Sequence, residues 1–228
     1  MAAIEVFEGY DAVVLADKPV GYWPLDERTG PWAFDQSGNG NTGRIVGGVT
    51  LGQPGVVPGT YAMGFNGATG VVQLSKEPVL STAVSIEAWA YTVQTANFAE
   101  VFNNNQIFLR QESTSEANGF AVFVKLSNGS VEPRAQNGVA VVTNTWYHLV
   151  ATWNGTTLSL YVNGALAATS GRAGILTTTT VTATIGAGEQ TNPAFNYWDG
   201  RLGRVAIYSY ALSPDRIAIH HLAGVNHA

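Results

Sequence analysis

Residues 146–169 read WYHLVATWNGTTLSLYVNGALAAT and contain two Asn-Gly pairs. Asn-Gly tolerates positive φ at both central positions of a turn, so it is the strongest short-range signal for a β-hairpin. Between the two pairs, Leu158, Leu160 and Val162 recur at every second position, which is the period of a strand with one buried face. The segment therefore predicts a meander of three strands, over 146–153, 158–162 and 165–169.

The same turn signal recurs along the chain. Asn-Gly occurs seven times between residues 39 and 164, and Asp199-Gly200 adds a related pair. No Gly/Ser/Pro-rich linker interrupts this pattern, so we expect many short antiparallel strands in a single domain spanning residues 1–228. Further strands are predicted over 84–93, 120–126 and 202–208.

Two short helices are predicted at the ends of the chain. Residues 11–17 can form about one and a half turns before Pro19 stops them. Ser213 is followed by proline and an acid, the pattern of a helix start, and Gly224 suits the end of that helix.

The strand predicted over 84–93 separates two kinds of side chain. Because neighbouring residues of a strand point to opposite sides, one face is small and apolar and the other is polar and aromatic. The apolar face, suited to a core between two sheets, carries Val84, Ile86, Ala88 and Ala90. The other face carries Ser85, Glu87, Trp89 and Tyr91.

Composition excludes several classes of function. Only 12% of the residues are charged and the net charge is −5, so the sequence gives no basic face. We therefore do not expect a nucleic-acid partner. There is no cysteine, which removes disulfides, thiolate nucleophiles and Cys-ligated zinc. No apolar run approaches the roughly 20 residues that span a bilayer, and residues 1–5 show no secretory signal. We therefore expect either a soluble protein made in a cytosol or a mature fragment without its signal.

Six motifs, taken in order, resemble the laminin-G-like jelly rolls of the concanavalin A-like lectin/glucanase superfamily. They are VLADKPVGYWPLDE (14–27), DQSGNGNTG (35–43), MGFNG (63–67), SIEAW (85–89), the Trp-rich block ending in LYVNG (146–164), and WDGRL with IY and ALS (198–213). Together they cover about residues 13–224. The resemblance implies an all-β fold, a two-sheet antiparallel jelly-roll sandwich with short N- and C-terminal helices.

The resemblance also implies a calcium ion beside the DQSGN loop. It would use Asp35 and Asn39, and Asn41 could add a further oxygen ligand. The second acid of the family pattern is missing, because that position reads Gly203-Arg204. The alternative, which we favour, is an Asx turn in which Asp35 only shapes the loop.

Two groups of residues offer carbohydrate chemistry, meaning an aromatic ring beside amide or carboxylate groups. The first lies in the loop 192–199 and consists of Phe195, Asn196 and Tyr197. The second is Glu87 with Tyr91 on the polar face of the strand 84–93. The large neighbouring rings of Trp89 and Trp198 are expected to lie in the core instead.

The sequence does not nominate a catalytic site. Retaining glycoside hydrolysis needs two carboxylates about 5–5.5 Å apart. Glu87 is the only acid inside a clearly predicted strand, and its neighbours on the same face are not acids. We interpret His220, His221 and His227 as a solvated helix end and His148 as a semi-buried strand residue. The glycine pattern of residues 38–43 is not followed by a helix, so it does not predict a nucleotide site.

These observations favour a non-catalytic binding or adhesion module that contacts a glycan or a protein surface, without membrane insertion. The family usually acts outside cells, and similar jelly rolls occur on virions. We therefore predict a bacteriophage virion surface protein, either a capsid decoration or a minor tail protein, that forms homo-oligomers or joins the shell or tail. A secreted bacterial lectin-like domain is the alternative, and a glycoside hydrolase with an unrecognised acid pair is less favoured.

Overall fold

The structure is a computed structural model, which describes residues 9–75, 82–95, 97–116, 119–128, 134–178, 181–188 and 195–225. Its strands form two sheets of eight strands each, and the strand pairs between described residues are antiparallel. Sheet A has the order β14 (Ala165–Gly171), β13 (Thr157–Val162), β12 (Trp146–Trp153), β7 (Val84–Thr92), β16 (Asp199–Tyr208), β5 (Tyr61–Asn66) and β4 (Val49–Pro54), and β1 (Gly21–Trp23) also pairs with β16. Sheet B has the order β11 (Arg134–Gln136), β10 (Phe120–Val124), β9 (Ile107–Gln111), β8 (Ala99–Asn103), β15 (Thr184–Ile185), β6 (Val71–Leu74), β3 (Gly43–Val46) and β2 (Trp32–Ala33). The predicted two-sheet antiparallel sandwich is confirmed.

The meander predicted from residues 146–169 is present as β12, β13 and β14. Val150 pairs with Tyr161 across the first hairpin, and Leu160 pairs with Ala168 across the second. In the second turn both Asn163 and Gly164 have positive φ, at 52° and 78°, which is the conformation that Asn-Gly favours. The turn and the buried face therefore specify the same register.

The core lies between the two sheets. The inner face of β7 (Val84, Ile86, Ala88, Ala90) is fully buried there, as the alternation predicts. Trp23, Trp153 and Trp198 lie in the same cluster, so the expectation that Trp198 is a core residue is confirmed. Large aromatic rings bury much apolar surface each, which suits a domain without disulfides.

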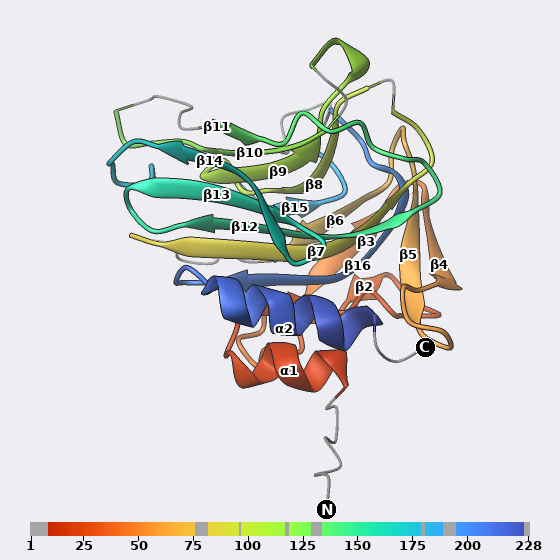
Figure 1. The fold of residues 1–228 in the computed structure, drawn as a ribbon. Helices are drawn as coiled ribbons and strands as arrows, with labels where there is room; N and C mark the ends of the chain where they lie inside the picture. Colours follow the sequence, from red (N-terminus) through yellow and green to blue (C-terminus); the bar gives the residue numbers. More distant parts are fainter. Residues whose placement is uncertain are drawn as a thin grey trace, which may run out of the picture.

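Two helices cover the other face of sheet A. Figure 1 shows α1 (Tyr10–Ala16) and α2 (Pro214–Val225) next to one another on the side of sheet A that faces away from sheet B. A second apolar cluster fills the space between helices and sheet, and it includes Val14, Trp89, Val150 and Ile217. Trp89 is 2% exposed, so its predicted place in a core is also confirmed, but in this second core rather than between the sheets.

The predicted end of α2 at Gly224 lies one residue before Val225, the last described residue of the helix. The helix runs to Val225, and Gly224 lies inside it, facing the ring of Trp89. A Cβ at residue 224 would come within 2.3 Å of the Trp89 ring, so glycine allows close packing of α2 on sheet A rather than a helix stop. No described helix is long and apolar enough to cross a membrane.

Candidate functional site

A pocket of about 510 Å³ opens where β16 begins. Its walls come from the segment after β7 (Gln94, Asn97, Phe98), from Ser113 after β9, and from Asn196 and Tyr197 before β16. We call it the Tyr197 pocket. Amide, hydroxyl and aromatic groups thus meet in one concave surface of a size usual for small-ligand sites.

A second pocket, of about 380 Å³, adjoins the first. It is lined by Tyr91 and Arg201, by Thr50 and Gln53 of β4, and by Asn66 at the end of β5. We call it the Tyr91 pocket. Asp199 lines both pockets, so the two hollows meet at this residue.

The period of β16 explains why Asp199 and Arg201 share one face. They are two positions apart, and Arg201 pairs with Tyr91 on one side and with Gly64 on the other. Gly64 has no side chain, which leaves room for the Tyr91 pocket above β5. The same outer face of sheet A that the helices cover further along is therefore open here.

Arg201 is held in place by aromatic rings and one backbone carbonyl. Its guanidinium carbon lies 3.7 Å from the ring centre of Tyr91 and 5.3 Å from that of Trp146. Its Nη1 donates to the carbonyl oxygen of Pro54 over 2.8 Å. Such stacking fixes the plane of the guanidinium and leaves its charge beside the pocket.

Asn196 is held by a buried acid beneath the Tyr197 pocket. Its Nδ2 donates to Glu100 Oε1 over 3.3 Å, and its carbonyl accepts the Glu100 amide over 2.9 Å. Burial raises the pKa of Glu100 to about 7, although the charge of Arg110 and the hydrogen bond from Asn196 act in the opposite direction. Burial also raises the pKa of Asp199. The amide of Asn196 is thus positioned before any ligand arrives.

Three of the five predicted ligand residues line these pockets: Asn196 and Tyr197 in one, Tyr91 in the other. Phe195 is 44% exposed and lies next to Asn196, but its ring packs over Gly188. Residues 192–194 of the predicted loop lie outside the described residues. Asp199 ends the predicted loop but was not named as a ligand residue, and Arg201 was missed, although their alternation within the WDGRL motif was a usable signal.

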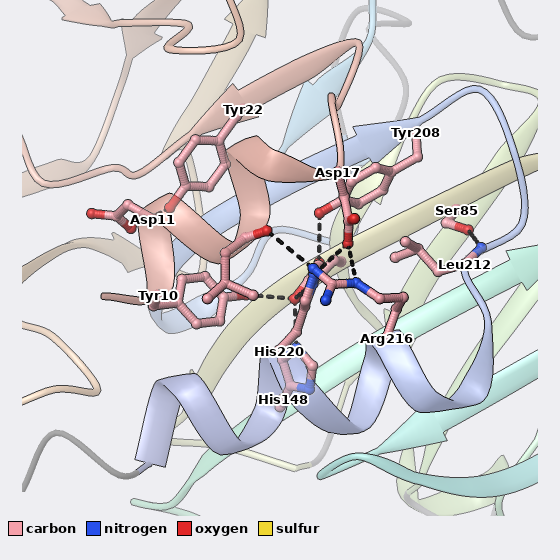
Figure 2. A network of polar contacts seen from close by, with 12 residues as sticks. Tyr10, Asp11, Asp17, Tyr22, Ser85, His148, Tyr208, Leu212, Arg216 and His220 are labelled. Atoms are coloured by element: carbon pink, nitrogen blue, oxygen red, sulfur yellow. Dashed lines mark hydrogen bonds and ion pairs between the residues drawn. The ribbon is translucent and has the colours of Figure 1, made fainter. Parts of the chain in front are cut away.

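The prediction that Glu87 faces a ligand is wrong, although the strand face on which it was placed is right. Glu87 is on the predicted face of β7 but is fully buried, because α1 and α2 cover that part of the face. Four groups surround its carboxylate: Tyr10 Oη at 2.6 Å, His148 Nε2 at 2.7 Å, Tyr208 Oη at 2.9 Å and His220 Nδ1 at 2.8 Å. Figure 2 labels these four partners. The carboxylate therefore holds elements together instead of meeting solvent.

His220 links this carboxylate to a second acid. Its Nε2 lies 2.8 Å from Asp17 Oδ2, which also accepts a hydrogen bond of 2.8 Å from Arg216 Nε (Figure 2). Two carboxylates, one at each ring nitrogen, favour the doubly protonated imidazolium. Burial alone would lower the pKa of His220, but the charge and hydrogen bonds of Glu87 and Asp17 outweigh it and raise the pKa.

The pKa of Glu87 is shifted in the opposite direction to that of His220. Burial would raise the pKa of Glu87, but the charge of His220 and hydrogen bonds from His148 and His220 lower it. The expectation of a solvated helix end is wrong for His220, which is fully buried, as is His148. His227 lies outside the described residues.

The predicted calcium ligands gather in one loop, but their contacts suit a turn better than a cation. Asp35 Oδ1 accepts the amides of Tyr22 (3.0 Å) and Ser37 (2.9 Å), and Oδ2 accepts that of Asn41 (2.8 Å). The side-chain nitrogens of Asn39 and Asn41 donate to the carbonyl of Val20. A carboxylate with three amide donors is an Asx-type anchor with little capacity left for a metal. The choice between the calcium site and the Asx turn, which we favour, is left to a binding measurement.

We expect no calcium effect on chelator-treated protein. Calorimetry should give no binding heat and thermal unfolding no rise in Tm, because Asp35 already satisfies backbone donors. Magnesium at the same concentration serves as the control for ionic strength. A saturable heat specific to calcium, with a matching rise in Tm, would establish the ion site instead.

Comparisons with known proteins agree with this architecture. A family model described as the concanavalin A-like lectin/glucanases superfamily matches residues 66–218. Among solved structures, the chain is similar to domain 4 of AbnA, a GH43 extracellular arabinanase from Geobacillus stearothermophilus, in complex with arabinotriose. The TM-score is 0.67 with 17% identity, over 90% of this chain and 98% of that chain. A comparison with the sequences of curated proteins gives no match.

Two toxin domains have the same fold. The binding domain of Paraclostridial Mosquitocidal Protein 1 gives a TM-score of 0.68 and 15% identity, over 91% of this chain and 52% of that one. The botulinum neurotoxin serotype D binding domain gives 0.64 and 17%, over 90% and 51%. This chain thus spans about half of each toxin domain. At such identities the likeness shows the fold alone, and the fold resemblance drawn from the six motifs is confirmed.

Proposed function

Because this chain belongs to the concanavalin A-like lectin/glucanases superfamily, we propose that it is a non-catalytic carbohydrate-binding module whose ligand occupies the Tyr197 and Tyr91 pockets. The observation that carries the proposal is that the two pockets meet at Asp199. Their walls carry amide, hydroxyl and carboxylate groups, with the rings of Tyr197 and Phe98 in one pocket and that of Tyr91 in the other.

The chemistry of these walls is that of a sugar site. Sugars present hydroxyl groups at their edges and apolar C–H faces, so they need amides, hydroxyls and carboxylates beside aromatic rings. Asn196 and Gln94 supply amides, Asp199 a carboxylate, and Tyr197 and Phe98 supply rings. Two adjoining pockets suit an oligosaccharide rather than a single sugar.

Three further observations support binding without hydrolysis. Within the described lining of the two pockets, Asp199 alone carries a carboxylate, whereas retaining hydrolysis uses two, about 5–5.5 Å apart. Glu87, the acid nominated by sequence, is buried beneath the helices. Among the structural neighbours, one is a domain in complex with arabinotriose and two are toxin binding domains, which agrees with a binding role.

We further propose where this binding module acts. The motif resemblance favours the surface of a bacteriophage virion, as capsid decoration or minor tail protein, where several copies would gain avidity. A secreted lectin-like domain is the alternative. Genes for capsid or tail proteins beside this one, and its peptides in purified virions, would support the first. A secretory signal in the full gene would support the second.

Replacing Tyr197 with alanine should weaken glycan binding by about tenfold, because the sugar loses a ring to pack against. Asn196→Ala should have a similar effect through lost hydrogen bonds. A glycan array identifies the ligand, and calorimetry measures each affinity. Phe34→Ala, which removes an exposed ring outside both pockets, is the matched control. An array on which the wild type binds nothing would overturn the proposed function.

A further inference from the structure

We propose that the Tyr91 pocket selects a sugar that carries a carboxylate, and that this group binds the guanidinium of Arg201. The inference rests on the proposed carbohydrate-binding function and adds the class of ligand. It starts from an arginine that is rigidly placed at a pocket yet has no acidic partner among the described residues.

Arg201 differs from the other buried and half-buried arginines of the described chain. Arg110 pairs with Glu112 at 3.0 Å, Arg204 with Asp11 at 3.2 Å, and Arg216 with Asp17 at 2.8 Å. No carboxylate of the described residues forms an ion pair with Arg201. Its one hydrogen bond there goes to the carbonyl of Pro54, which uses one of five N–H donors.

The stack on Tyr91 prepares Arg201 for a planar anion. A guanidinium fixed 3.7 Å above a ring loses little further side-chain entropy when it binds. Its remaining donors form a fork that matches the two oxygens of a carboxylate, and such bidentate pairs are stronger than neutral hydrogen bonds. A neutral hydroxyl would use only part of this arrangement.

The rest of the pocket fits the ring of such a sugar. Gly64 lies opposite Arg201 in register and leaves space over β5, while Thr50 and Gln53 border that space with a hydroxyl and an amide. Asp199 lies on the same face, two positions before Arg201, and can accept sugar hydroxyls. Arg201 would therefore bind the carboxylate of the ligand, and Asp199 would accept hydrogen bonds from its hydroxyl groups.

The test compares ligands that differ only in the charge of the carboxyl group. Uronic-acid oligosaccharides, such as those of galacturonic and mannuronic acid, are titrated as free acids and as methyl esters, with sulfated neutral oligosaccharides as a third arm. We expect the free acid to bind about tenfold or more tightly than its ester, with an advantage that shrinks as salt rises. Sulfated sugars should gain less, because a sulfate ester spreads its single charge over three oxygens, each of which is a weaker hydrogen-bond acceptor than a carboxylate oxygen.

Arg201→Gln should reduce the affinity for the free acid to that for the ester. Arg28→Gln is the matched control, because Arg28 also stacks on a tyrosine, Tyr61, at 5.1 Å, but lines neither pocket. It should keep the full preference for the acid. Circular dichroism and Tm of each variant report folding.

A failure of the carboxylate assignment can be distinguished from a failure of the carbohydrate-binding proposal. Equal binding of acid and ester by the wild type would overturn this inference and leave the carbohydrate-binding proposal standing. A stronger gain from sulfate than from carboxylate would overturn the carboxylate assignment. An equal loss of acid and ester binding in Arg201→Gln would assign Arg201 a structural role and also overturn it. Binding to no glycan at all would remove the proposed function first.

Discussion

Glu87→Ala is expected to lower the free energy of unfolding by about 3–5 kcal/mol, the usual cost of removing one partner from a buried ion pair. The substitution leaves an imidazolium, a second histidine and two phenols buried without their shared acceptor, in His220, His148, Tyr10 and Tyr208. Urea unfolding near neutral pH, followed by tryptophan fluorescence, measures the loss. It should exceed that of an apolar truncation of equal size, because unpaired polar groups add to the cavity.

Two comparisons sharpen this result. Glu87→Gln keeps the shape and one acceptor oxygen but removes the charge, so its cost should fall between wild type and alanine. Asp215→Ala removes an exposed acid from the first turn of α2 and should cost about 1 kcal/mol or less. A loss below about 1 kcal/mol for Glu87→Ala would mean that the helices do not depend on this carboxylate.

Activity assays on Glu87 variants need a parallel measurement of stability. Sugar release abolished in Glu87→Gln would suggest a hydrolase only if the variant stays folded. Glu87 touches β12, β16, α1 and α2 through its four partners, so its loss can alter the molecule without any direct contact to substrate. Stability and activity therefore need to be measured on the same preparation.

Local sequence signals predicted the sheets well. In β7 and β12 to β14, alternation and turn chemistry point to one register, because a slip by one residue would move the apolar row to the wrong face. Part of the candidate site also followed from local signals. Asn196 and Tyr197 combine an amide and a ring in a connecting segment, which is where binding residues concentrate.

Local signals could not predict which part of the outer face of sheet A is covered by the helices. Alternation assigns Glu87, Trp89 and Tyr91 to one face but does not say what covers it. Glu87 and Trp89 lie beneath α2, which begins more than a hundred residues later, whereas Tyr91 lies beyond the helices. Likewise, Gln94 and Asn97 reach the Tyr197 pocket from a segment without periodicity. Long-range packing decides both outcomes.

His220→Gln is expected to destabilise the protein in a pH-dependent manner, by about 3 kcal/mol near pH 5.5 and less as the pH rises. The pKa of His220 is raised from 6.5 in the folded chain, so its proton is held more tightly than in the unfolded chain. Its contribution is therefore complete below pH 6.5 and is lost as the pH rises through the raised pKa. Glutamine carries no charge at any pH and removes this dependence.

Glu87 determines the lower end of the pH range in which its ion pair with His220 stabilises the fold. Its pKa is lowered from 4.5 on folding, so its stabilisation is present above pH 4.5 and is lost as the pH falls further. The pair thus contributes most between pH 4.5 and 6.5. Other groups titrate as well, and Glu100, with a pKa raised to about 7, favours the folded state less as the pH rises from 4.5 to 7. The difference between wild type and variant cancels that background.

His221→Gln provides a control from the same helix with the opposite sign. Burial, and then the charge of His148, lower the pKa of His221, so its protonation in acid opposes folding. The unfolding free energy of the wild type minus that of His221→Gln should therefore increase as the pH rises toward 6.5. The corresponding difference for His220→Gln should decrease as the pH rises above 6.5. Urea unfolding of the three proteins at several pH values gives both differences. A pH-independent difference for His220→Gln would show that the ring does not carry the positive charge between Glu87 and Asp17.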